Sequence, residues 1–121
     1  MFKKPHERVK LFMAYVITNK CLNEQYAQCV DVCPAECIYP GLYQKQRFMV
    51  IDPKRCINCD ACLLACPIGA IVNTEEQDKK YARINKTLAK KFRGNPDVIP
   101  KNPKSKPNRS ENKLIYEKSE N

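Results

Sequence analysis

Four cysteines in the middle of the chain stand at a spacing that strongly limits what the chain can fold into. They read C-x2-C-x2-C-x3-C, are followed at once by Pro67, and are Cys56, Cys59, Cys62 and Cys66. This spacing is typical of iron–sulfur proteins, in which the first three thiolates hold one cluster and the fourth reaches a second cluster. Pro67 fixes the direction of the backbone after the last cysteine. The motif therefore predicts a chain that folds around two clusters.

A degenerate second copy of the motif lies upstream. A shift of 33 residues superimposes the segment 29–34 on the segment 62–67, so that two cysteines and a proline coincide. Each half is also predicted to open with a short apolar strand, at residues 14–18 and 48–52. Such self-similarity predicts two structurally related halves.

The first half lacks one ligand of its own cluster. Glu24 stands where the second half has Cys59, and Cys37 falls on Ala70, which is not a ligand position. Because the fourth cysteine of each run crosses to the other cluster, the thiols divide into a set of four and a set of three. The set of four is expected to hold a [4Fe–4S] cube and comprises Cys33, Cys56, Cys59 and Cys62. The set of three comprises Cys21, Cys29 and Cys66.

Three thiolates favour a [3Fe–4S] cluster, which is a cube with one empty corner. The alternative is a complete cube whose fourth iron takes an oxygen of Glu24, although oxygen matches a cluster iron less well than thiolate does. Cys37 is left as a free thiol, and we expect it to pack beside the cube as a small apolar side chain. A redox-sensing or ligand-exchanging role is the other interpretation of Cys37.

Two other chemistries of cysteine-rich chains fit this sequence less well than iron–sulfur clusters do. Zinc ligands usually come as separated C-x2-C pairs, and secreted disulfide-bonded domains lack the continuous run followed by proline. The apolar run at residues 11–17 is too short to span a bilayer, and no signal-peptide cleavage site follows it. We therefore expect a cytoplasmic protein with no transmembrane segment.

These motifs resemble those of the seven-iron bacterial ferredoxins, which carry one [3Fe–4S] and one [4Fe–4S] cluster. The similar segments are A-Y-V-I-T-N-K-C, Q-C-V-D-V-C-P-A-E-C-I-Y and F-M-V-I-D-P-K-R-C-I-N-C-D-A-C-L-L-A-C-P. The resemblance covers about residues 13–92 and implies the same two ligand sets, with Cys37 free. It also implies an α+β fold: a small pseudo-twofold dicluster domain of short antiparallel strands and short helices, with a C-terminal helix and an extended tail. Glu24 is a departure, because members often carry a non-ligating cysteine there.

The chain divides into four predicted segments. Residues 1–12 form a basic arm without predicted structure, and 13–72 form the dicluster domain. Residues 73–93 are predicted to form a helix packed on that domain, because apolar residues recur there at helical spacing. Thr74 with Gln77 resembles a capping box, and the apolar stripe comprises Tyr81, Ile84, Leu88 and Phe92. Residues 94–121 are proline-rich and polar, and are expected to be extended or disordered.

The predicted apolar core is thin, so the clusters are expected to supply much of the folding free energy. Its members are Val16, Ile17, Val30, Val32, Ile38, Val50, Ile51, Ile57, Leu63, Leu64, Ile68 and Ile71.

Charge and composition favour electron transfer over catalysis. The chain has 22 Lys and Arg against 13 Asp and Glu, a formal net charge of +9, which suits an acidic partner. No nucleic acid is expected, because aromatic residues do not interleave with the basic ones. No constellation of Ser, His and carboxylate side chains suggests an enzyme, so outer-sphere one-electron transfer is the expected chemistry.

The resemblance implies a soluble, monomeric carrier that exchanges electrons with redox enzymes such as a ferredoxin reductase or a ferredoxin-dependent oxidoreductase. Lys20, Lys54 and Arg55 precede ligands closely and are expected to form a docking rim. The alternative is an electron-transfer subunit of a larger redox complex. A less favoured interpretation is iron storage or sensing through the open corner near Glu24.

Overall fold

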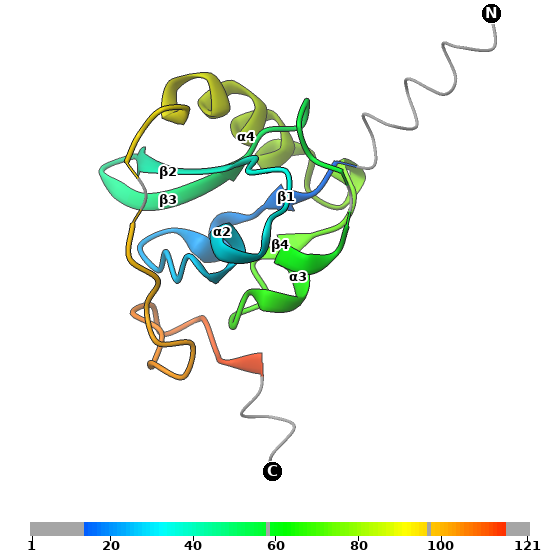
Figure 1. The fold of residues 1–121 in the computed structure, drawn as a ribbon. Coiled ribbons are helices and arrows are strands. Elements are labelled where there is room, and N and C mark those ends of the chain that lie inside the picture. The colour runs from blue at the N-terminus through cyan, green and yellow to red at the C-terminus, as the bar shows by residue number, and fades with distance from the viewer. Residues whose placement is uncertain (1–13, 58, 97, 116–121) are drawn as a thin grey trace, which may run out of the picture.

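The computed structural model describes residues 14–57, 59–96 and 98–115; the predicted basic arm at 1–12 lies outside them. Short strands and short helices alternate, followed by one longer helix, as Figure 1 shows. The elements are β1 (Val16–Ile17), α2 (Gln28–Val32), β2 (Ile38–Tyr43), β3 (Gln46–Ile51), α3 (Ala61–Ala65), β4 (Ile71–Val72) and α4 (Lys79–Phe92), with 3-10 turns at Asn19–Cys21 and Glu75–Asp78. The predicted α+β class is confirmed.

Both strand pairs join one half of the sequence repeat to the other. β1 pairs antiparallel with β4, with Ile17 opposite Ile71, and β2 pairs antiparallel with β3, with Ile38 opposite Ile51. The predicted strands at 14–18 and 48–52 correspond to β1 and β3. Because each half completes the sheet of the other, the halves depend on each other for their backbone hydrogen bonds.

The hairpin between β2 and β3 has a two-residue turn at Gln44 and Lys45. Their φ angles are 53° and 64°, as expected for a type I′ turn, in which both central residues have positive φ. The sequence carries no Asn-Gly or Asp-Gly at this point, so the usual local signal for such a hairpin is missing. Strand β2 was accordingly not expected from the sequence.

Helix α4 begins later than the sequence suggested. The predicted capping box at Thr74 is wrong, because Asp78 is the N-cap and its Oδ1 accepts a 3.0 Å hydrogen bond from Tyr81 N. Gln77 Nε2 instead donates to Thr74 Oγ1 across the preceding 3-10 turn. The helix ends at Phe92, just before Gly94 (φ 91°), as predicted.

The buried face of α4 is also offset from the predicted stripe. Ile84 and Leu88 are only half-buried, whereas Asn85 and Ala89 are buried. This face packs against β1 and β3 (Figure 1). A polar side chain therefore lies at the centre of the contact between the helix and the strands.

The core differs from the predicted one at its edges. Phe48 and Met49 are fully buried and were missed, whereas Val32, Ile57 and Leu64 are 42%, 59% and 65% exposed. Residues next to cluster ligands were expected to be covered because they are apolar. The structure instead leaves these three on the surface.

Candidate functional site

The two short helices α2 and α3 carry matching local geometry at the 33-residue offset of the repeat. The residue before each helix, Ala27 or Asp60, has φ 66°, and each helix is capped at its C-terminal end by a cysteine in extended conformation, Cys33 or Cys66. Positive φ is unfavourable for residues with a Cβ by about 1–2 kcal/mol. Both halves therefore accept the same local strain to place their cysteines.

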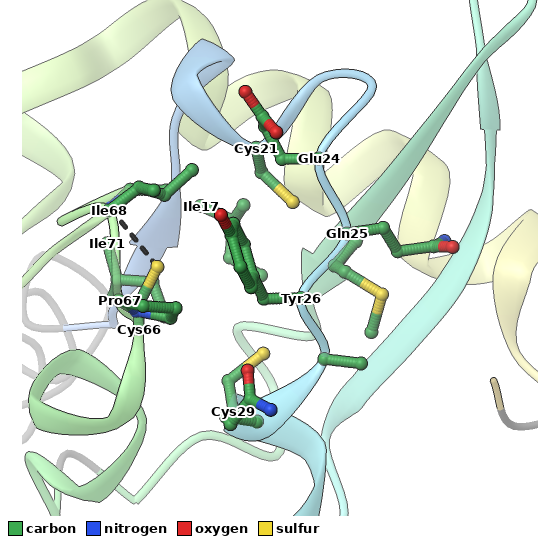
Figure 2. Close-up of a pocket in the computed structure, with 14 residues that line it drawn as sticks. Ile17, Cys21, Glu24, Gln25, Tyr26, Cys29, Cys66, Pro67, Ile68 and Ile71 are labelled. Atoms are coloured by element: carbon green, nitrogen blue, oxygen red, sulfur yellow. Dashed lines mark hydrogen bonds between the residues drawn. The ribbon is translucent and has the colours of Figure 1, made fainter. Parts of the chain in front are cut away.

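One set of cysteines surrounds a cavity beneath β1 and β3. Cys21, Cys29 and Cys66 line it, and all three are buried. Figure 2 shows their sulfurs approaching the same space from different sides. Most of the remaining lining is apolar, and it includes Ile17, Met49, Pro67, Ile68, Ala70 and Ile71. We call this space the first cavity.

A separate cavity collects the other cysteines. It is lined by Cys33, Cys37, Cys56, Cys59 and Cys62, together with Tyr15, Ile51 and Ile57. Cys59 is exposed, Cys33 and Cys56 are half-buried, and Cys62 is buried. The cysteines of this second cavity are therefore more exposed than those of the first, which are all buried. The hydroxyl of Tyr15 donates to Asp60, which fixes the turn that precedes α3.

Burial governs the titration of these thiols. Desolvation, reinforced by Cys66, raises the pKa of Cys21 to about 12, and desolvation with Cys56 and Cys33 raises that of Cys62 to about 12. Desolvation likewise raises the pKa of Cys29 and of Cys66. These four buried thiols are thus protonated at neutral pH in the absence of metal. Because a bound metal needs the thiolate, metal binding here releases protons.

Backbone amides reach one of these sulfurs. Ala70 N donates to Cys66 Sγ over 3.3 Å, and the amides of Ile68 and Gly69 also act to lower the pKa of that thiol against the effect of burial. Hydrogen bonds to sulfur favour the thiolate and tune an attached metal. The turn after Cys66 is therefore built to hold negative charge on sulfur.

Cys37 lies beside the second set without matching its sequence position. Its Sγ is 3.4 Å from Cys33 Sγ, and the side chain is buried. A hydrogen bond with Cys56, desolvation and contact with Cys33 raise the pKa of this thiol well above its usual range. Its counterpart Ala70 carries no ligating group. Cys37 is thus a neutral thiol packed against the ligand candidates.

The structure encloses Glu24, the possible oxygen ligand. The side chain is only 2% exposed and lines the first cavity. Its Oε1 accepts a hydrogen bond from Asn108 N, and its Oε2 accepts from Arg109 N and Asn112 Nδ2. Figure 2 shows the carboxylate turned away from the sulfurs of Cys29 and Cys66. Sequence reasoning missed this partnership, because its donors lie 84–88 residues away.

The donor chemistry suits iron–sulfur clusters, because thiols on apolar walls surround two separate volumes. Within the described residues, no group of three or more His, Cys, Asp or Glu side chains is arranged to hold a single metal ion. A cluster distributes its thiolates over several irons, so its ligands encircle a volume and do not converge on one point.

Comparison with known proteins agrees with this assignment. Residues 49–72 match the family described as 4Fe-4S binding domain. A protein named Ferredoxin 7Fe, from Hydrogenibacillus schlegelii, is 43% identical over 82 residues, which cover 65% of this chain and 100% of that protein. The chain belongs to the bacterial ferredoxins. A further ferredoxin relative, Ferredoxin-1 of Caulobacter vibrioides, is 39% identical over 80 residues, 64% of this chain and 67% of the relative.

The shared region of these ferredoxins does not extend over the whole chain. A ferredoxin of Rickettsia felis is 44% identical over 59 residues, 49% of this chain and 50% of that protein. Ferredoxins are iron–sulfur electron-transport proteins, and the thiol-lined walls of the two cavities suit that chemistry. Along the described residues, none of the helices combines the length and the apolar character that crossing a membrane requires.

Proposed function

We propose that this ferredoxin is a cytoplasmic one-electron carrier with one [3Fe–4S] and one [4Fe–4S] cluster. Cys21, Cys29 and Cys66 are the proposed ligands of the three-iron cluster. Cys33, Cys56, Cys59 and Cys62 are the proposed ligands of the cube. The clusters supply the redox chemistry, and the chain makes and breaks no substrate bond, so it is not an enzyme.

The observation that carries this proposal is the division of the cysteines between the two cavities. The first cavity holds three thiols and the second holds the other five, one of which, Cys37, has no ligand equivalent in the repeat. A fourth iron in the first cavity would need another donor. Glu24 is the candidate, because it stands at the repeat position of Cys59. Its oxygens, however, already accept hydrogen bonds from residues 108–112. We therefore favour three irons there.

The chain's own residues tune and shield the two centres differently. The apolar lining of the first cavity excludes water, and the Ala70 amide supports the thiolate of Cys66. Cluster potentials depend on burial and on hydrogen bonds to sulfur. Cys59, which lines the second cavity, is exposed, so the cube is the proposed site of electron exchange with a partner.

The surface around Cys59 suits an acidic redox partner. Exposed Ile57 and Leu64 provide apolar contact, and Lys54 and Arg55 are exposed just before Cys56. Complementary charge speeds encounter without needing a large interface. We propose that a ferredoxin reductase or a ferredoxin-dependent oxidoreductase docks here on a monomeric carrier. A stable stoichiometric partner on gentle purification would instead favour a subunit of a larger redox complex.

Iron counting combined with EPR spectroscopy of the anaerobically purified, oxidised protein tests the proposed clusters. An oxidised [3Fe–4S] cluster has an unpaired spin, whereas an oxidised [4Fe–4S] cube has none. We expect close to one spin per chain and about seven irons. A silent spectrum with about eight irons would overturn the three-iron assignment and return Glu24 to consideration as a ligand.

A further inference from the structure

Glu24 occupies a distinctive place in the repeat. It stands at the position of Cys59 in the other half, where a thiol reaches the surface. Here the same position carries a carboxylate that is buried at the wall of the first cavity. A buried charge is costly unless it is paired and hydrogen-bonded. The residues that stabilise the buried carboxylate therefore indicate the role of Glu24.

Within the described residues, all the hydrogen-bond and ion-pair partners of this carboxylate come from the C-terminal segment. Asn108 N and Asn112 Nδ2 each lie 2.7 Å from a carboxylate oxygen, and Arg109 N lies 3.0 Å away. Lys101 Nζ adds an ion pair at 3.8 Å. Charge-assisted hydrogen bonds of this kind are the strong ones. We call residues 101–115 the strap.

The strap also bonds beside each of the three cysteines of the first cavity. Next to Cys21, Asn112 Nδ2 donates to Lys20 O. Next to Cys29, Gln28 Nε2 donates to Lys101 O. Next to Cys66, Ile115 N donates to Pro67 O over 2.9 Å.

Tyr26, in the loop between Cys21 and Cys29, also binds the strap. Lys101 N donates to Tyr26 O over 2.9 Å, and the Lys101 ammonium lies 4.0 Å from the centre of the Tyr26 ring. The Tyr26 hydroxyl donates to Ser105 O. The strap thus follows the loop from Cys21 to Cys29 and ends beyond Cys66. In Figure 1 it descends past the end of the molecule that carries α2 and α3.

We propose that Glu24 is a positioning residue that latches the strap over the first cavity and thereby shields the cluster held there. The proposal rests on the proposed function, because it needs a cluster at Cys21, Cys29 and Cys66. It goes further, because it assigns a structural role to Glu24, which stands at the position of the missing fourth ligand. With its oxygens engaged by the strap, Glu24 leaves the open corner without a ligand and keeps solvent and chelators away from it.

Glu24→Gln tests the latch. Glutamine has nearly the same shape, but its amide nitrogen is a donor and must face either Asn108 N or the donors of Arg109 and Asn112. The matched control is Glu111→Gln, which removes the same charge from the strap itself, where Glu111 is exposed and pairs with Arg109. Exposed pairs of this kind contribute little.

Two readouts report on the strap and on the cluster separately. Trypsin cleavage after Lys101, Lys104 and Arg109 reports strap opening. Under an iron chelator, loss of the oxidised three-iron EPR signal reports exposure of the first cluster, and the cube of the same molecule is the internal control. In Glu24→Gln we expect both rates to rise about tenfold, equivalent to ~1.4 kcal/mol of strap closure. We expect Glu111→Gln and the rate of cube loss to stay close to wild type.

Asn112→Ala keeps the carboxylate and removes one bond to it, so it covers the case in which Glu24→Gln does not fold. It should raise the same two rates, and the double variant should show less than the product of the separate effects. Wild-type cleavage and wild-type cluster loss in both single variants would overturn the latch. Absence of a three-iron signal in the wild-type protein would overturn the proposed function instead, while the trypsin measurement would still decide whether Glu24 holds the strap.

Discussion

Asn85 and Ile17, 68 residues apart, form a reciprocal pair of hydrogen bonds at the centre of the molecule. Ile17 N donates to Asn85 Oδ1 over 3.0 Å, and Asn85 Nδ2 donates back to Ile17 O over 2.9 Å. The same Oδ1 accepts from Ile51 N, and the same Nδ2 donates to Tyr81 O. All four hydrogen-bonding positions of the amide are filled. One side chain of α4 thus ties β1 to β3.

Asn85→Ala should therefore be strongly destabilising. It leaves the buried amides of Ile17 and Ile51 without their acceptor, and each such group costs about 1–3 kcal/mol. We expect the apparent midpoint of thermal bleaching of the clusters, measured at one scan rate, to fall by about 10 °C. Thr87→Ala, at an exposed position of the same helix, is the control and should change the midpoint little. Equal midpoints for both variants would contradict the role of Asn85.

Gly41 is in close contact with the aromatic ring at the end of α4. A Cβ added at Gly41 would lie 2.5 Å from the nearest carbon of the Phe92 ring. Gly41→Ala must displace that ring and should cost about 1–3 kcal/mol, measured by the same bleaching midpoint. Adding Phe92→Leu makes room, so the double variant should lose less stability than the sum of the two single variants. Simple additivity would show that the two positions do not meet.

Cys37 and Cys62 line the same cavity, but we expect them to differ in iron binding. Cys37→Ala introduces the residue that stands at the equivalent place in the other half, Ala70, and should cost about 1 kcal/mol for the lost contact. Its iron content should stay at the wild-type value. Cys62→Ala removes a proposed ligand and should lower the count by about four irons. Iron and sulfide analysis of the freshly purified variants measures this difference. Loss of iron from Cys37→Ala would show that Cys37 is a ligand.

The basic residues before Cys56 should control association with an acidic partner. Reversing Lys54 and Arg55 to Glu should slow electron exchange about tenfold at low salt, with the difference shrinking as ionic strength rises. Stopped-flow oxidation of the reduced ferredoxin by an acidic redox protein measures this. The same double reversal at Lys90 and Lys91, exposed at the end of α4, controls for net charge. Equal slowing at both places would exclude a specific docking surface at Lys54 and Arg55.

The local design of the site could be predicted from the sequence. The spacing of cysteines and prolines within each half is a property of nearby residues, so the repeat can be recognised from the amino-acid sequence. It reappears in the structure as helices that start after left-handed residues, Ala27 and Asp60, at the same offset. The strands at 14–18 and 48–52 were predicted for the same reason, since short apolar runs are a local signal.

What escaped prediction depends on contacts between distant segments. Asn85 breaks the apolar stripe of α4, yet it is buried because strands from both halves present backbone groups to it. Val32, Ile57 and Leu64 are apolar but exposed, because they lie on the outer side of segments whose inner side carries the thiols. Neither outcome follows from residue type or helical spacing alone.

Glu24 shows this division most clearly. The sequence by itself determined that a carboxylate replaces a thiol in the first half of the repeat, so that only Cys21, Cys29 and Cys33 stand there at the four cysteine positions of the motif. Only the tertiary structure decided where that carboxylate points, because its donors at 108–112 are remote in the chain and belong to a segment without regular periodicity. Ligand spacing is set by covalent geometry over a few residues, whereas the surroundings of a buried charge are set by whichever distant segment can satisfy it.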